Sequence, residues 1–320
     1  MLFSAFLVLV LPLTLAQNIV LSNDDGWAVA HIRATNDALT SAGFDVVLSA
    51  PAENQSGTGS ETSTPGVLTS ECEFDTCPVG SPAQGFNATA PSLNYVNGFP
   101  ADAAKYGIQT LAPQFFGTAP DLVVSGPNVG SKCYHLQLPD IVRSRISGNL
   151  GLAVLLSGTV GAAVEATTLN IPALAISGTT GTQVSYTTLT TDPTSANSAA
   201  ALVYGALTAR LVSALTSSSG PLLPANTVLN VNYPATSATT CSDASDFTFV
   251  LSRIIPNPFV DDVELCGSSH LPTESTVVGT SGGCFVSVSV MEASTKFDAG
   301  ETVQAAVVQT LGSFLGCLPS

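Results

Sequence analysis

Positively charged residues are scarce in this sequence. Its 320 residues include eight Lys and Arg against 23 Asp and Glu, which gives a net charge of −15 and a pI near 4.2. A surface of this kind repels nucleic-acid polymers and anionic membranes. We therefore expect neither a nucleic-acid polymer nor, once the protein is mature, a membrane as a partner.

Long apolar runs are also few. Residues 2–15 are almost wholly apolar and lead to the small residue Ala16, a pattern typical of a secretory signal peptide (residues 1–16), although the usual positive charge is missing. The run is shorter than a membrane span, and no second segment has the length and apolarity of a transmembrane helix. We expect a mature, secreted protein that begins at Gln17.

Cysteine is limited to seven residues. Export favours disulfide bonds, and an odd number leaves one thiol over. We expect Cys72 and Cys77 to close a local loop and Cys133 to be the unpaired residue. The other four are expected to staple the C-terminal region, in a connectivity that the sequence does not decide: Cys241, Cys266, Cys284 and Cys317.

Short apolar runs alternate with amphipathic stretches, which is typical of a parallel sheet with crossover helices and predicts an α/β fold. Strands are predicted at residues 18–22, 45–50, 121–125, 172–177, 228–232 and 284–290. Helices are predicted at residues 29–42, 102–111, 159–169, 196–215 and 301–315. Residues 52–100 are rich in Ser, Thr, Gly and Pro and are expected to form long loops and edge strands. We divide the mature chain into an α/β core at 17–240 and a less regular, disulfide-containing extension of the same domain at 241–320.

Two adjacent carboxylates, Asp24 and Asp25, follow the first predicted strand, and Gly26 comes directly after them. In an open α/β sheet, ligands bind beyond the carboxyl ends of the strands. Adjacent carboxylates repel each other unless a cation or a shared proton relieves them, and Mg²⁺ prefers such oxygen ligands. The alternative is a solvated turn, because Asn-Asp-Asp-Gly also has ordinary turn chemistry.

Other oxygen ligands occur where predicted strands end or a helix begins. Ser56 follows the second strand, and Asn128 follows the strand at 121–125. Because loops at the carboxyl ends of parallel strands gather on one edge, both could meet Asp24 and Asp25 around one ion. Residues 157–161 would present backbone N–H groups at a helix N-terminus, where phosphate binds well. Taken singly, each has an ordinary structural explanation that we favour: Ser56 as a loop hydroxyl, Asn128 as a turn residue and residues 157–159 as an N-cap.

Together, these segments resemble the SurE-like survival-protein family of 5′-nucleotidases and acid phosphatases. The matching motifs stand in chain order at residues 21–26, 50–57, 98–102, 120–130, 157–163 and 171–177. The resemblance implies a Rossmann-like, three-layer α/β/α core. It also implies a C-terminal region that often mediates oligomerisation, so a homodimer or higher oligomer is possible.

The resemblance further implies a divalent-metal phosphomonoesterase that uses Mg²⁺ or Mn²⁺, with nucleoside 5′- or 3′-monophosphates as the default substrates. The implied metal ligands are Asp24, Asp25, Ser56 and Asn128. Phosphate is expected at Ser157, Gly158 and Thr159. Either aspartate could instead act as base or nucleophile. None of the three histidines lies in these motifs, and His31, inside a predicted helix, is expected to be structural.

Two other classes of protein are alternatives to a phosphatase on this fold. A dinucleotide-binding oxidoreductase should show Gly-x-Gly-x-x-Gly after the first strand, and residues 23–28 hold a single glycine. A non-catalytic secreted binding or effector protein on the same fold is harder to separate. Loss of a metal ligand would favour it, and all four are present.

Two sequons, at Asn54 and Asn87, make N-glycosylation possible in an exported chain. Asn54 lies two residues from Ser56, so a glycan there would crowd the expected metal. We therefore expect Asn87 to be the more readily glycosylated of the two.

Residues 132–148 interrupt the family pattern, which stops after Gly130 and resumes at Asn149. This segment holds three of the eight Lys and Arg (Lys132, Arg143 and Arg145) as well as Cys133. It could be an active-site lid or a translated retained intron. Possible codons for residues 131–133, 139–140 and 147–148 accommodate a splice donor, a branch point and an acceptor, and excision keeps the reading frame. We favour the intron.

Transcript sequencing tests the intron directly. We expect transcripts in which the codon for Ser131 is joined to the codon for Asn149. If every transcript carries residues 132–148, the intron is wrong and the lid becomes the interpretation to test.

Overall fold

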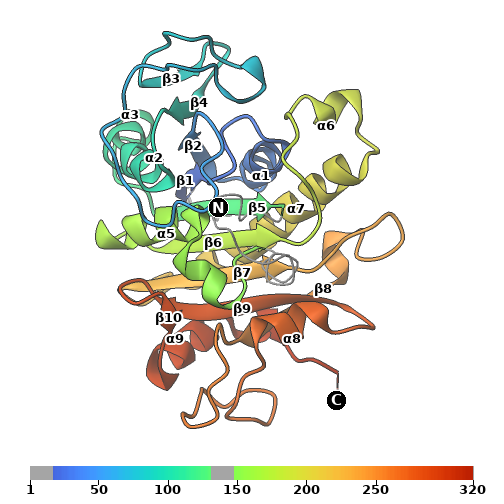
Figure 1. Cartoon of the computed structure of the whole chain (residues 1–320). Coiled ribbons are helices and arrows are strands. Elements are labelled where there is room, and N and C mark those ends of the chain that lie inside the picture. The colour runs from blue at the N-terminus through green and yellow to red at the C-terminus, as the bar shows by residue number, and fades with distance from the viewer. Residues whose placement is uncertain (1–16, 131–147, 320) are drawn as a thin grey trace, which may run out of the picture.

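The computed structural model describes residues 17–130 and 148–319. The predicted signal peptide, Cys133 and all but the last residue of the 132–148 segment therefore lie outside the described residues. Figure 1 shows one central sheet with helices on both of its sides, in agreement with the predicted α/β class.

Through residue 233, strands are joined by helical segments, except that β3 and β4 follow one another as a hairpin. The strands are β1 (Asn18–Ser22), β2 (Asp45–Pro51), β3 (Gln84–Asn87), β4 (Ala90–Val96), β5 (Leu122–Val129), β6 (Ala173–Gly178), β7 (Thr227–Tyr233), β8 (Phe247–Ser252), β9 (Cys284–Glu292), β10 (Phe297–Asp298) and β11 (Leu315–Gly316). The α-helices are α1 (Ala30–Ser41), α2 (Pro100–Tyr106), α3 (Ala112–Phe116), α5 (Gly158–Thr168), α6 (Thr188–Thr191), α7 (Ala196–Thr216), α8 (Glu274–Gly279) and α9 (Glu301–Leu311). Tighter or wider turns form η1 (Glu73–Asp75), η2 (Gly107–Leu111), η3 (Gly151–Leu155), η4 (Ala244–Asp246) and η5 (Gly312–Phe314).

The strand order places a topological switch point beside β1. The sheet runs β11-β8-β9-β7-β6-β5-β1-β2-β4-β3, and β10 pairs with β9. From β1 the chain moves to β2 and β4 on one side and then returns to β5 and β6 on the other, all in parallel pairing. Ligand crevices of open α/β sheets lie at such a reversal, beyond the carboxyl ends of the strands. The fold thus predicts a site where β1 and β5 end.

Alternation along β1 explains the three layers. Ile19 and Leu21 belong to the apolar cluster that contains buried residues of α1 and α7, whereas Val20 belongs to the cluster that contains Val160 of α5. Successive side chains of a strand point to opposite faces, so both faces of β1 are buried. Helices α1 and α7 therefore cover one face, and α2 and α5, which pack together, cover the other.

Most predicted elements are present, with longer or broken ends. The helix predicted at 102–111 begins at Pro100, because the Asp102 carboxylate accepts a hydrogen bond from the Phe99 N–H (3.0 Å) at the helix start, and it continues through η2 into α3. The strand predicted to end at Ser125 continues to Val129 after a shift in its pairing with β6. Strand β8 and helix α8 were not predicted.

The C-terminal part contributes to the same sheet. Strand β9 pairs antiparallel with β7 and parallel with β8, so the sheet continues directly into this region. Disulfides join Cys72 to Cys77, as expected, and tie the C-terminal region through two further pairs: Cys241–Cys284 and Cys266–Cys317.

Helix α7 corrects one expectation. By length and composition it could cross a membrane, although no segment after residue 15 was predicted to have that character. More than half of its most apolar window is buried within the structure, and the helix packs against α1. Its apolarity is therefore accounted for by its place in the core.

Candidate functional site

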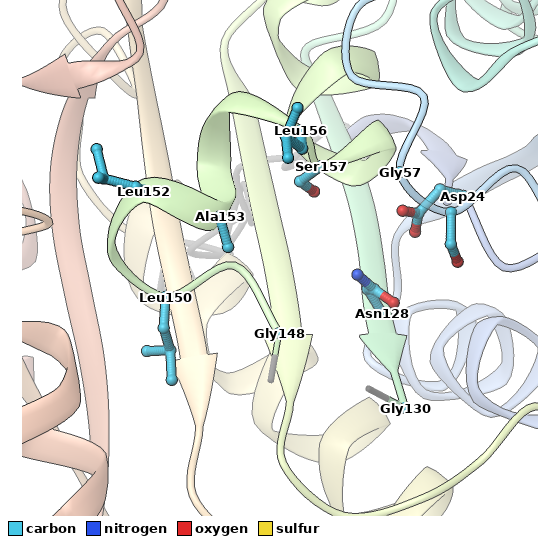
Figure 2. Close-up of a pocket in the computed structure, with 11 residues that line it drawn as sticks. Asp24, Gly57, Asn128, Gly130, Gly148, Leu150, Leu152, Ala153, Leu156 and Ser157 are labelled. Carbon is cyan, nitrogen blue, oxygen red and sulfur yellow. The ribbon is translucent and has the colours of Figure 1, made fainter. Parts of the chain in front are cut away.

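A pocket of about 240 Å³ opens where β1 and β5 end. Its polar lining comes from four separate segments and includes Asp24, Ser56, Asn128 and Ser157. Figure 2 shows Asp24, Asn128 and Ser157 around the same space, with Leu150 and Leu152, at the start of the turn η3, on the side away from Asp24. The structure thus brings three of the four predicted metal ligands and one predicted phosphate residue into one pocket.

Asp24 is held between β1 and the start of α5. Its side chain is 1% exposed, and its Oδ1 accepts a hydrogen bond from the Thr159 hydroxyl at 2.5 Å. Gly158 permits this close approach, because a Cβ atom there would stand 2.9 Å from the Asp24 Cβ. The predicted phosphate residue Thr159 therefore directs its side chain to Asp24, and Gly158 provides the space between them.

Asp25 lies beside the pocket and does not line it. Its Oδ2 accepts a hydrogen bond from the Val129 N–H (2.9 Å), and its Oδ1 accepts one from the Gln183 amide. These contacts connect the end of β1 to the end of β5 and to the loop after β6. A carboxylate oxygen can accept more than one bond, so Asp25 keeps acceptor capacity for a cation.

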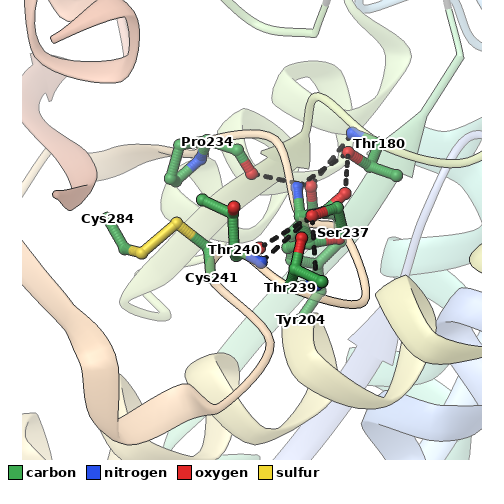
Figure 3. The surroundings of a disulfide bond; sticks show 9 residues. Thr180, Tyr204, Pro234, Ser237, Thr239, Thr240, Cys241 and Cys284 are labelled. Carbon is green, nitrogen blue, oxygen red and sulfur yellow. Dashed lines mark hydrogen bonds between the residues drawn. A yellow bond between two sulfur atoms is a disulfide. The ribbon is translucent and has the colours of Figure 1, made fainter. Parts of the chain in front are cut away.

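The loop that carries Gln183 is anchored by α7. The Tyr204 hydroxyl donates to the carbonyl of Pro234 (2.8 Å) and accepts from the Thr180 N–H (2.9 Å), as Figure 3 shows. The Thr180 hydroxyl in turn accepts from the Thr236 N–H (2.9 Å). The Cys241–Cys284 disulfide closes the neighbouring segment. Sequence reasoning missed Gln183, because it stands in a polar, turn-rich stretch with no motif around it.

Asn54 and Ser56 form a compact turn at the pocket edge. The Asn54 Oδ1 accepts from both the N–H (2.8 Å) and the hydroxyl (2.7 Å) of Ser56, and its Nδ2 donates to Gln183 Oε1 (2.9 Å). The Ser56 oxygen keeps its acceptor lone pairs. Because glycosylation modifies Nδ2, a glycan on Asn54 would disturb this contact.

The first turn of α5 begins at the pocket, on the side where the sequence predicts phosphate binding. The Ser157 hydroxyl caps the helix by accepting from the Val160 N–H (3.1 Å) and donates to Asn149 Oδ1 (2.7 Å). Gly161 lets the helix pack closely on the loop after β2, since a Cβ there would lie 1.8 Å from the Gly59 carbonyl oxygen. The N-terminus of α5 therefore opens to the pocket in a fixed position.

Behind Ser157, a buried polar network extends to the C-terminal region. Asn230 of β7 donates its Nδ2 to the Asn149 carbonyl (2.8 Å) and to Glu274 Oε1 (2.6 Å). Glu274 Oε2 accepts from the Gly151 N–H (2.9 Å), at the start of η3. Burial raises the pKa of Glu274 to about 8. Glu274 was not predicted, because its role depends on strand pairings that bring residues 123 positions apart together.

The side chains around the pocket fit a hard divalent cation. Asp24, Asp25, Ser56 and Asn128 offer only oxygen donors apart from the Asn128 amide nitrogen, as Mg²⁺ and Mn²⁺ prefer. No group of three or more His, Cys, Asp or Glu that could hold a metal occurs among residues 17–130 and 148–319. The described part therefore offers no cluster of thiolates or imidazoles of the kind that structural Zn²⁺ sites use. His31 is buried in α1, outside the pocket lining, and burial lowers its pKa to about 4.

Glu274 should make stability fall as pH rises. Between about pH 4.5 and 8 the folded protein keeps a proton that the unfolded chain has released, so the free energy of unfolding drops with pH by at most about 1.4 kcal/mol per unit. Denaturant unfolding at pH 6.5 and 8 should show this loss in the native protein and a smaller one in Glu274→Gln. The exposed Glu264→Gln should behave like the native protein. An identical pH dependence in Glu274→Gln would contradict the assignment.

Comparison with known proteins identifies the family. A profile described as survival protein SurE matches residues 19–138 and 132–254, in two pieces that meet inside the 132–148 segment. An acid phosphatase of Yarrowia lipolytica is 32% identical over 88% of this chain and 80% of its own length. A 5′-nucleotidase SurE of Geobacter metallireducens is 33% identical over 68% of this chain and 65% of its own length.

The fold has a solved counterpart. The crystal structure of the SurE protein from Aquifex aeolicus aligns with a TM-score of 0.55 and 21% identity, over 91% of this chain and 98% of that protein. This likeness concerns the fold, whereas the profile match covers more than half of the sequence. The chain belongs to the SurE survival-protein family.

Proposed function

We propose that this protein is a secreted phosphomonoesterase that requires a divalent cation and acts on nucleoside monophosphates. The observation that carries the proposal is the convergence of Asp24, Ser56, Asn128 and the N-cap Ser157 on one pocket. The names of its relatives, acid phosphatase and 5′-nucleotidase SurE, support the same reaction class. Hydrolysis of a phosphate monoester needs charge neutralisation and positioning. A cation held by these oxygen atoms would supply the first, and the N-terminus of α5 would supply the second.

One side of the pocket would bind the metal ion and the other side would bind the phosphate. Asp24, Asp25, Ser56 and Asn128 would hold Mg²⁺ or Mn²⁺, which when bound polarises a phosphoryl oxygen and lowers the pKa of water at the site. The N-terminus of α5 would bind the phosphate through backbone N–H groups and the helix dipole. Thr159 keeps Asp24 oriented, and Gln183 with the Val129 N–H keeps Asp25 oriented.

The apolar wall suits the rest of the substrate. Leu150, Leu152, Ala153 and Leu156 line the pocket opposite the carboxylates, and Leu152 is 62% exposed. An aromatic or nucleoside leaving group would bury more apolar area against this surface than a polyol would. This wall is the reason to favour nucleoside monophosphates over sugar phosphates.

Export is proposed on the basis of the apolar segment at 2–15 and the three disulfides. Asn87, in the β3–β4 hairpin, is the proposed glycosylation site, and Asn54 is disfavoured by its bond to Gln183. N-terminal sequencing of secreted protein should begin at Gln17, and Asn87→Gln should remove the glycan mass. A homodimer or higher oligomer is proposed from the family resemblance alone.

Asp24 should be essential for metal-dependent hydrolysis. Removing even an outer partner of a metal ligand costs about 10- to 100-fold in affinity or activity, so Asp24→Asn should lose more than about 100-fold in kcat. Native activity should vanish in chelator and return with Mg²⁺ or Mn²⁺, and Asp25→Asn should resemble Asp24→Asn. The exposed Asp246→Asn serves as the matched control. Full activity of the native protein in excess chelator would refute the metal requirement.

A substrate panel separates the enzyme from the alternative, a non-catalytic binding protein. With metal present, nucleoside 5′- and 3′-monophosphates and an aryl phosphate should give higher kcat/KM than glycerol or sugar phosphates. Leu152→Ser should reduce that preference by roughly tenfold, since apolar pocket contacts are worth about 1–3 kcal/mol. If no phosphomonoester is hydrolysed, the binding protein becomes the better interpretation.

A further inference from the structure

A second cavity, of about 670 Å³, is lined by Trp27, which follows the two aspartates in the chain, and by Arg33 of α1. It is bounded by the β3–β4 hairpin, the loop closed by the Cys72–Cys77 disulfide, and residues 185–187. Its lining and that of the first pocket have no residue in common. It is therefore a distinct site, although Trp27 in its wall stands only two positions after Asp25.

Arg33 of α1 contributes a buried cation to this second cavity. The residue is 6% exposed, and its Nε donates to the Trp27 carbonyl at 2.7 Å. The guanidinium carbon lies 5.1 Å from the centre of the Trp27 ring and 4.6 Å from that of Tyr186. With Nε engaged and aromatic rings against the guanidinium, the Nη1–Nη2 edge is the part that can face the cavity.

The charge of Arg33 is not neutralised by an ion pair within the described part of the chain. Lys105 and Arg253 form ion pairs there, but Arg33 forms none. Burial lowers the pKa of Arg33, while Tyr186 and Asp37, an exposed carboxylate one turn further along α1, oppose this shift. The carboxylate in the cavity lining is Asp75, which is exposed. A buried guanidinium with an unoccupied edge is suited to a planar oxyanion, which it can bind through two parallel hydrogen bonds.

The remaining walls of the cavity are aromatic. Tyr95 packs against Trp27 with ring centres 5.3 Å apart, and Phe86 and Phe74 line the cavity while being 60% and 39% exposed. Exposed phenylalanine rings beside a concave surface favour a flat apolar partner. We propose that this second cavity binds a small molecule with a carboxylate or phosphate-like oxyanion and an aromatic ring, with Arg33 holding the oxyanion and Phe86 and Phe74 contacting the ring.

The chain contains a natural reporter for this site. Trp27 is its single tryptophan, it lines the cavity and it stacks on Arg33. Titration of tryptophan fluorescence with benzoate and with phenylphosphonate, which has no ester bond to hydrolyse, should give saturable curves. The two probes distinguish a carboxylate from a phosphate-like anion. Acetate, which lacks the ring, and benzamide, which lacks the charge, should bind at least about tenfold more weakly than the better probe.

Variants locate the bound probe. Arg33→Lys keeps the charge but cannot form the two parallel bonds, so the Kd should rise at least about tenfold. Phe86→Ala, at an exposed position that leaves the core intact, should also weaken binding. Asp75→Asn should strengthen it by up to about fivefold, because an exposed repulsion is removed. Asp24→Asn, in the first pocket, and Lys105→Gln, at a distant surface cation, should leave the Kd unchanged.

Several results would overturn the proposal. One is the absence of a saturable fluorescence signal with both probes. Another is an unchanged Kd in both Arg33→Lys and Phe86→Ala. A third is loss of binding in Asp24→Asn, because that result would place the probe in the first pocket. If Arg33→Lys does not fold, Phe86→Ala and Asp75→Asn still decide the matter through their opposite shifts. Because Asn87 lines the same cavity, all proteins should carry Asn87→Gln, so that no glycan covers it.

Discussion

Two carboxylates side by side at the end of a buried strand are the constraint on which the rest of the site depends. Asp24 and Asp25 are almost fully buried, and a buried charge is tolerated only where other groups stabilise it. The surrounding chain compensates with donors from three directions: the Thr159 hydroxyl, the Val129 N–H and the Gln183 amide. Each donor belongs to a different segment, so the carboxylates hold together β1, β5, α5 and the loop after β6.

The C-terminal part of the chain supports this arrangement from behind. Glu274 binds Gly151 and Asn230, Asn230 binds Asn149, and Asn149 accepts from the Ser157 hydroxyl. The series runs from helix α8 to the N-cap of α5 through buried groups alone. Strand β9, paired with β7, fixes α8 relative to the sheet. The C-terminal region is therefore a structural part of the pocket as well as an extension of the sheet.

The fold and the polar side of the site could be predicted because both follow from local patterns. The apolar run that ends at Asp24 indicates the end of a strand, and the turn that begins at Ser157 indicates the start of a helix. In a parallel sheet, strand ends and helix starts of this kind lie at the same edge of the sheet. Gln183 and Glu274 could not be predicted in this way. Their roles depend on contacts between residues more than 120 positions apart, and neither stands in a pattern of its own. The bond from the Thr159 hydroxyl to Asp24 is likewise a long-range contact that the sequence did not reveal, and phosphate binding at Thr159 stays a prediction.

The central claim is that these oxygen atoms form a site for one divalent cation. Anomalous diffraction from crystals soaked in Mn²⁺ tests it most directly, because Mn²⁺ replaces Mg²⁺ at oxygen sites and is located without reference to activity. The account predicts an anomalous peak bounded by Asp24, Ser56 and Asn128, with Asp25 beside it, and its absence in Asp24→Asn. A well-occupied Mn²⁺ elsewhere, with none between these residues, would contradict it.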